Sequence, residues 1–158
     1  MQRRSGGSSL EILRMPPRIK ILEALGAIAD GRVRVVSDRE AIVVSSEGDR
    51  SYRVYVDLEK RVAYSDDNGT RYRGYVGYPI AAFLMLRGVL PFRRDLAEAL
   101  RGIRWRQLNE KYKSYSAVEE VIFRELRSRS IDPEEVIKYM EEVMRSLSSL
   151  GLRRSSST

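Results

Sequence analysis

Between residues 32 and 76 apolar side chains recur at every second position, in short runs separated by three or four residues. The runs cover residues 32–36, 41–46, 51–57, 61–65 and 70–76. A period of two is typical of a β-strand with one buried face. Connections this short join antiparallel neighbours and cannot cross over to a parallel strand. The sequence therefore predicts a five-stranded antiparallel meander, with a hairpin turn at Asn68-Gly69, where both residues tolerate positive φ.

Helical spacing flanks this region on both sides. A helix is predicted over residues 17–30, and a second over Ile80–Leu86, which is apolar all round and therefore expected in the core. Further helices are predicted over residues 93–101, 103–112, 116–126 and 133–150. Ser116 to Glu119 has the spacing of a capping box, and Asp132-Pro133 is a strong helix start.

These elements predict an α+β fold. It has an N-terminal helix, a five-stranded antiparallel meander, and a C-terminal group of four to five helices packed on one sheet face. We expect one domain over residues 16–151, preceded by a disordered tail over residues 1–15 and followed by a tail over residues 152–158.

The chain of 158 residues contains no cysteine and no histidine. Zinc sites of the Cys/His kind and hydrolases with a catalytic histidine are therefore excluded. Scarce amides and abundant charge are typical of heat-adapted proteins. The longest apolar run, Ile80–Leu86, is shorter than the roughly 20 residues a membrane helix needs, and the first nine residues lack a signal's apolar stretch. We expect a cytoplasmic protein with no membrane partner and no cofactor.

The net charge of +7 is concentrated in one part of the chain. Residues 77–115 carry eight basic and three acidic residues. A basic rim is predicted there, formed by Arg101, Arg104, Arg106, Lys111 and Lys113. Basic side chains on one surface attract phosphates, although a solvated helix face has the same composition.

Alternation divides the predicted sheet into two faces. The apolar set is expected to face the helices and consists of Val33, Val35, Ile42, Val44, Tyr52, Val54, Val56, Val62, Tyr64, Tyr72 and Val76. The opposite set is expected on the outer face and consists of Arg32, Arg34, Arg53, Tyr55, Arg61, Arg71, Arg73 and Tyr75. Single-stranded bases stack on aromatic side chains and their phosphates bind arginine.

The function predicted from these residues is non-enzymatic binding of nucleic acid, RNA before DNA, by the arginine and tyrosine side chains of the outer sheet face and by the basic rim. A solvated antiparallel face without a ligand would show the same alternation. Two alternatives stay open. One is a structural or interaction module that forms a homo-oligomer. The other is a magnesium-dependent phosphoesterase using Asp57, Asp66 and Asp67.

The segment Gly74-Tyr-Val-Gly-Tyr-Pro-Ile-Ala-Ala-Phe-Leu-Met-Leu resembles a family of uncharacterised archaeal proteins, over about residues 17–150. The resemblance implies no activity. The helix at 17–30 followed by hairpins loosely resembles the end of a winged-helix domain, without its two preceding helices. A hairpin leading into an apolar helix is also similar to the SWIM zinc-finger layout, but the metal-binding Cys and His have no counterpart here.

Overall fold

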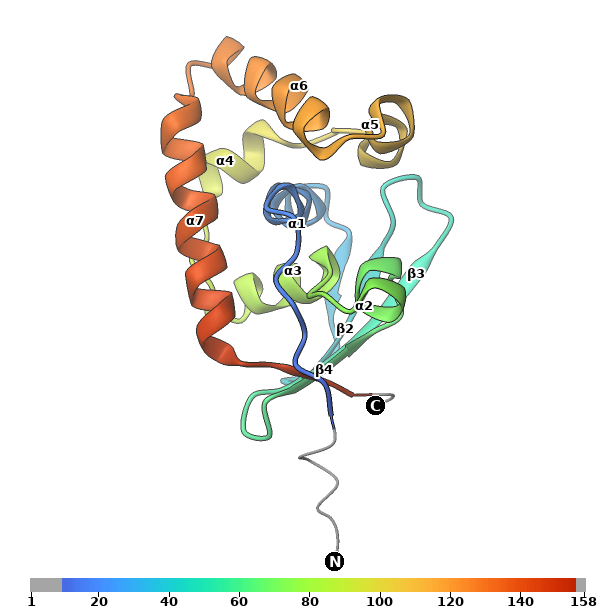
Figure 1. Ribbon diagram of the computed structural model, residues 1–158. Coiled ribbons are helices and arrows are strands. Elements are labelled where there is room, and N and C mark those ends of the chain that lie inside the picture. Colours follow the sequence, from blue (N-terminus) through green and yellow to red (C-terminus); the bar gives the residue numbers. More distant parts are fainter. Residues whose placement is uncertain (1–9, 156–158) are drawn as a thin grey trace, which may run out of the picture.

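The computed structural model describes residues 10–155 and shows an α+β fold with helices around one twisted sheet (Figure 1). The helices are α1 (Ile19–Ala29), α2 (Asn68–Arg73), α3 (Tyr78–Leu86), α4 (Arg94–Ala99), α5 (Trp105–Tyr112), α6 (Tyr115–Ser128) and α7 (Pro133–Leu150). The strands are β1 (Val33–Val35), β2 (Glu40–Val44), β3 (Ser51–Asp57), β4 (Val62–Ser65) and β5 (Arg153–Arg154). The predicted fold class is confirmed.

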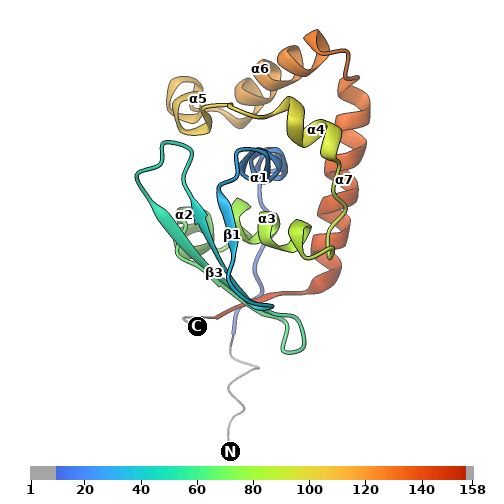
Figure 2. The same ribbon diagram turned by 180° about the vertical axis from the view of Figure 1, so that it is seen from behind.

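Helices α1 and α3 pack against each other at the centre of the core. Residues 79–85 of α3 are all buried, as its apolar sequence predicts. Figure 1 shows the sheet on one side of this pair and α7 on the other. Seen from behind in Figure 2, α4 and α6 close over α1. Within residues 10–155, none of the helices combines the length and apolar composition needed to cross a bilayer.

The strands lie in the order β1-β2-β3-β4-β5, and every neighbouring pair is antiparallel except β4 and β5, which are parallel. The fifth strand comes after α7 instead of before α3. Leu152, which precedes it, is buried, and its carbonyl accepts a hydrogen bond from the Leu13 N–H at 2.8 Å. Residues 152–154, expected in a tail, therefore belong to the sheet region. Of the tails expected over residues 1–15 and 152–158, residues 1–9 and 156–158 lie outside the described residues. Residues 10–15 are described, and Leu13 among them is buried in the core.

The predicted strand over residues 70–76 and the hairpin turn at Asn68-Gly69 are wrong. Residues 68–73 form the short helix α2. Asp67 accepts a hydrogen bond from the Thr70 N–H and so caps this helix. Gly74 ends it with a left-handed backbone (φ 72°), a conformation that glycine adopts at no steric cost. The chain therefore turns away from β4 through a helix, which removes Arg71, Arg73 and Tyr75 from the sheet.

The assignment of faces is correct for β3 and wrong for β2 and β4. Val54 and Val56 of β3 are buried as predicted. Ala41 and Val43 are the buried residues of β2, and Ala63 and Ser65 those of β4. Ile42, Val44, Val62 and Tyr64 lie on the opposite side, where they are half-buried. Of the other residues predicted to face inward, Val35 is exposed at the sheet edge and Tyr72 is exposed on α2.

The helix ends follow the expected capping chemistry with one shift in register. Asp132 caps α7 as predicted, since its carboxylate accepts a hydrogen bond from the Glu134 N–H. The cap of α6 is Ser114, whose hydroxyl accepts from the Ala117 N–H, and the capping box predicted at Ser116 is therefore wrong. This shift places Tyr115 in the first turn of α6, beside the cavity described below.

Candidate functional site

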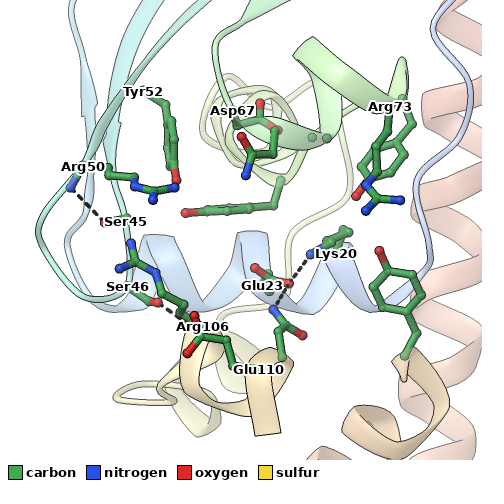
Figure 3. Close-up of a pocket in the computed structure, with 17 residues that line it drawn as sticks. Lys20, Glu23, Ser45, Ser46, Arg50, Tyr52, Asp67, Arg73, Arg106 and Glu110 are labelled. Atoms are coloured by element: carbon green, nitrogen blue, oxygen red, sulfur yellow. Dashed lines mark hydrogen bonds and ion pairs between the residues drawn. The ribbon is translucent and has the colours of Figure 1, made fainter. Parts of the chain in front are cut away.

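A cavity of about 450 Å³ opens where the tip of the β2–β3 hairpin approaches α1, α5 and the segment around α2. Figure 3 shows side chains from these elements pointing into it. Its lining consists of Lys20, Glu23, Ser45, Ser46, Arg50, Tyr52, Asp67, Asn68, Gly69, Arg73, Tyr75, Gly77, Tyr78, Arg106, Asn109, Glu110 and Tyr115. The volume suits a small ligand, and the lining is unusually polar for such a site.

The hairpin tip is held to α5 by an arginine. The Arg106 guanidinium donates to both carboxylate oxygens of Asp49, at 2.9 and 2.6 Å, and the backbone N–H of Arg106 donates to Ser46 Oγ at 3.2 Å. The hydrogen bonds from Arg106 hold the pKa of Asp49 well below its usual value. Arg106 thus fixes the wall of the cavity, and its charge is neutralised by Asp49.

The floor of the cavity is an ion pair on α1. The Lys20 ammonium donates to Glu23 Oε1 at 2.8 Å, and Asn109 Nδ2 on α5 donates to the same oxygen at 3.4 Å. The two side chains are only 15% and 6% exposed. Burial by itself would lower the pKa of Lys20, but attraction to Glu23 outweighs it and the pKa is raised. Lys20 therefore keeps its positive charge, and Glu23 is its ion-pair partner.

Four tyrosines, Tyr52, Tyr75, Tyr78 and Tyr115, line the cavity. The rings of Tyr52 and Tyr78 meet edge to face, with centroids 6.4 Å apart. A Cβ at Gly69 would lie 2.8 Å from Tyr75 Cζ, so glycine is required for this ring to fit. Burial raises the pKa of Tyr75 and of Tyr78, so both hydroxyls stay protonated and can donate hydrogen bonds.

Asp67 ties the start of α2 to the start of α3. Its carboxylate accepts from the Thr70 N–H at 3.1 Å and from the Thr70 hydroxyl at 2.9 Å, and that hydroxyl oxygen accepts from the Gly77 N–H at 3.0 Å. Burial raises the pKa of Asp67, while hydrogen bonds from Ser65 and Thr70 oppose the shift. The network fixes the backbone that carries Tyr75 and Tyr78 into the cavity.

The residues predicted for a nucleic-acid interface fall into separate groups. Arg34, Arg53 and Tyr55 lie on the outer sheet face, in register through the pairs Arg34–Ile42 and Ile42–Arg53. Tyr55 donates to Asp57 Oδ2 at 3.5 Å. The outer face thus keeps three of its eight predicted residues, and Tyr64 joins it opposite Tyr55.

Three arginines of the predicted face have internal partners. Arg32 donates to the carboxylate of Asp30 and to the Val44 carbonyl, Arg61 donates to the Leu150 carbonyl, and Arg71 lies over the ring of Tyr72. The remaining two residues of the predicted outer face, Arg73 and Tyr75, line the cavity. These five residues do not form one surface with the outer sheet face.

The predicted basic rim is also divided. Arg101 is paired with Glu98, and Arg106 with Asp49. Arg104 and Lys111 line a groove of about 550 Å³ between α5 and α6, and Lys113 is exposed at the end of α5. The cavity brings together Arg73 and Tyr75 from the predicted sheet set and Arg106 from the rim.

The sequence prediction missed Lys20, Glu23, Arg50, Asn109 and Tyr78. One signal was present for the floor: Glu23 interrupts the apolar run of α1, with buried residues on either side of it. A carboxylate inside a buried helix segment needs a partner. Arg50 and Tyr78 gave no such signal, because the hairpin and the α2–α3 connection bring them to the cavity only in the folded chain.

The fold and the cavity define an α+β protein with a polar cavity between its sheet and helices. The chain belongs to the family described as Uncharacterised conserved protein UCP014422, whose model matches residues 13–153. No curated protein and no solved structure matches the chain. The family match confirms the predicted resemblance to a family without an assigned activity, and its archaeal attribution stays a prediction.

Carboxylates do not gather into a cluster in the described part of the chain. Nowhere in residues 10–155 do three or more Asp or Glu side chains come together in a way that could hold a metal ion. Asp57 accepts from the Glu59 and Lys60 N–H groups, Asp66 accepts from the Arg53 N–H, and Asp67 caps α2. Each of the three carboxylates proposed for phosphoesterase chemistry thus serves a different backbone segment.

Proposed function

We propose that the protein binds single-stranded nucleic acid, RNA in preference to DNA, without catalysing a reaction, and that the cavity is the centre of the binding surface. One observation carries the proposal. The cavity combines four tyrosines with two arginines, Arg50 and Arg73, whose side chains have no hydrogen bond or ion pair to any residue between 10 and 155. Stacking rings beside uncompensated guanidinium groups are what a base and its phosphate require.

The state of the other arginines supports this choice of surface. Several surface arginines are neutralised within the fold, including Arg93 by Asp95, Arg101 by Glu98 and Arg129 by Glu125. Figure 3 shows Arg50 on the hairpin side and Arg73 on the α2 side, so that the two side chains flank the cavity. A bound strand crossing the cavity would meet both arginines.

The test is fluorescence anisotropy with a labelled seven-nucleotide RNA and its DNA counterpart over a range of salt concentrations. Each phosphate neutralised on a single strand adds about 0.7 to the slope of log K against log salt. Arg50→Ala with Arg73→Ala should therefore weaken binding and lower the slope by about 1.4, since two phosphate contacts are lost.

Two further pairs serve as controls. Arg127→Ala with Arg145→Ala removes two exposed arginines outside the cavity and should leave the slope nearly unchanged. Arg34→Ala with Arg53→Ala tests the outer sheet face predicted from the sequence. Unmeasurable affinity at low salt, or equal losses in the cavity pair and in the Arg127 and Arg145 pair, would refute the proposal.

A second candidate function is self-association through the sheet edge. β1 is an outer strand, and Val35 and the adjacent Val36 are 48% and 51% exposed. An uncovered strand edge with apolar side chains can pair with the same edge of a second copy. Light scattering at high salt tests this: a dimer that becomes monomeric in Val35→Lys supports it, and a monomer at all concentrations removes it. The C-terminal helix is a poorer candidate because its apolar face is already buried in the core.

A further inference from the structure

The floor of the cavity presents a hydrogen-bond acceptor that no described residue uses. Glu23 Oε1 receives both available donors, Lys20 and Asn109, whereas Oε2 receives no hydrogen bond from any residue in the range 10–155. The Glu23 side chain is only 6% exposed. Because Glu23 lines the cavity, this oxygen is open to a ligand that supplies a hydrogen-bond donor.

Lys20 adds a donor directly beside this acceptor. One ammonium hydrogen is used by Glu23, and no other described residue accepts from Lys20. The ammonium also lies 5.6 Å from the centre of the Tyr115 ring. Lys20 and Glu23 thus present one donor and one acceptor edge side by side, and Figure 3 shows both projecting from α1 into the cavity between Arg50 and Arg73.

Among the four bases of RNA, this arrangement matches the Watson–Crick edge of guanine. That edge carries an acceptor, O6, followed by two donors, N1–H and the N2 amino group. Lys20 can donate to O6 while Glu23 accepts from N1–H and N2. Adenine and cytosine place an unprotonated ring nitrogen where the carboxylate needs a donor, and uracil offers only one donor. Side-chain pairs that match a base edge in this way give its recognition.

We propose that the cavity is a guanine site, in which Lys20 and Glu23 read the base, the surrounding tyrosines stack on it, and Arg50 and Arg73 hold the adjoining phosphates. The inference rests on the proposed nucleic-acid function and names the nucleotide that the same site selects. Asn109 is a positioning residue, because its amide holds Glu23 Oε1 and leaves Oε2 directed to the base.

The experiment compares four labelled RNAs that differ at one position: UUUGUUU, UUUAUUU, UUUUUUU, and the variant with inosine at the central position. The guanine RNA should bind about tenfold to a hundredfold more tightly than the adenine RNA, the range for one well-matched base contact. Inosine lacks only the N2 amino group and should fall between them. Glu23→Gln should abolish the preference, whereas Glu110→Gln, a change at an exposed carboxylate of the same cavity, should keep it.

The base series uses the unaltered protein, so the result does not depend on whether a Glu23 variant folds. Equal affinity for all four RNAs overturns the guanine site and leaves the nucleic-acid function standing. Calorimetry with GMP and AMP separates the remaining outcomes. If GMP binds and no oligonucleotide does, the guanine site stands and the nucleic-acid function falls. If neither GMP nor any RNA binds, both fall.

Discussion

Replacing Gly77 by alanine tests whether Asp67 is as closely packed as the structure indicates. Gly77 has φ −73° and ψ 163°, an ordinary extended conformation, so alanine meets no backbone strain there. Its Cβ, however, would lie 2.5 Å from Asp67 Oδ1 and 2.6 Å from Asp67 Cγ. The carboxylate is buried and is held by the amide and hydroxyl of Thr70, so it cannot move without losing these bonds.

The expected loss follows from those bonds. Removing a helix N-cap costs about 1 kcal/mol, and leaving a buried polar group without its partner costs roughly 1–3 kcal/mol. Alanine in place of glycine returns about 0.4–1 kcal/mol by restricting the unfolded chain. The net destabilisation should therefore be about 2 kcal/mol, even though a glycine-to-alanine change at this backbone conformation would otherwise stabilise.

Urea unfolding followed by Trp105 fluorescence measures this change. Gly88→Ala is the matched control. Gly88 has φ 75° and nothing lies within 4 Å of the added Cβ. The only expected cost is about 1 kcal/mol for placing alanine in a left-handed conformation. A double-mutant cycle isolates the cause. In the background of Asp67→Ala, Gly77→Ala should cost almost nothing, because the carboxylate it meets is gone. An undiminished cost in that background would refute the explanation.

Three further changes are predicted from the same structure. Gly26→Ala places a Cβ 2.7 Å from Trp105 Nε1 and should destabilise by about 1–3 kcal/mol in the same urea assay; an unchanged midpoint contradicts this. Because burial raises the pKa of Asp67 above its usual 3.8, its contribution to stability is full below pH 3.8 and is lost as the pH rises through the folded-state pKa. Asp67→Asn should flatten that part of a pH series of unfolding free energies, and an identical pH profile would show that the carboxyl is not perturbed. Truncation after Gly151 removes buried Leu152 together with β5, and should cost at least the roughly 1.5–3 kcal/mol of one buried leucine; unchanged thermal stability would mean that residues 152–155 are dispensable.

Much of the fold was predictable because periodicity and capping residues agree over most of the chain. The apolar α3 and the Asp132 cap of α7 needed no tertiary information. The region after β4 was mispredicted because the segment Asp67-Asn68-Gly69 is compatible with two local structures. Asn-Gly favours a hairpin turn, whereas an aspartate can cap a helix that begins immediately after it. The packing of Tyr75 against Gly69 is compatible only with the second, and local sequence does not contain that contact.

The faces of β2 were ambiguous for a related reason. Ala41, Ile42, Val43 and Val44 are all apolar, so alternation assigns no side to the strand. The structure buries Ala41 and Val43, in register with Val54 and Tyr52 of β3. The side is therefore set by the neighbouring strand. The cavity could not be predicted from the sequence for the same reason, because its lining comes from four segments that meet only in the folded chain.

The parallel pairing of β4 with β5 gives this protein a particular order of assembly. Arg153 follows its partner Val62 by 91 residues, and α2 to α7 lie between them. Because synthesis proceeds from the N-terminus, the edge of β4 that pairs with β5 stays unpaired while these helices are made. An open strand edge can pair with another chain. In a growing chain, the hazard of misassembly at this edge therefore lasts until the end of α7 and residues 152–154 leave the ribosome.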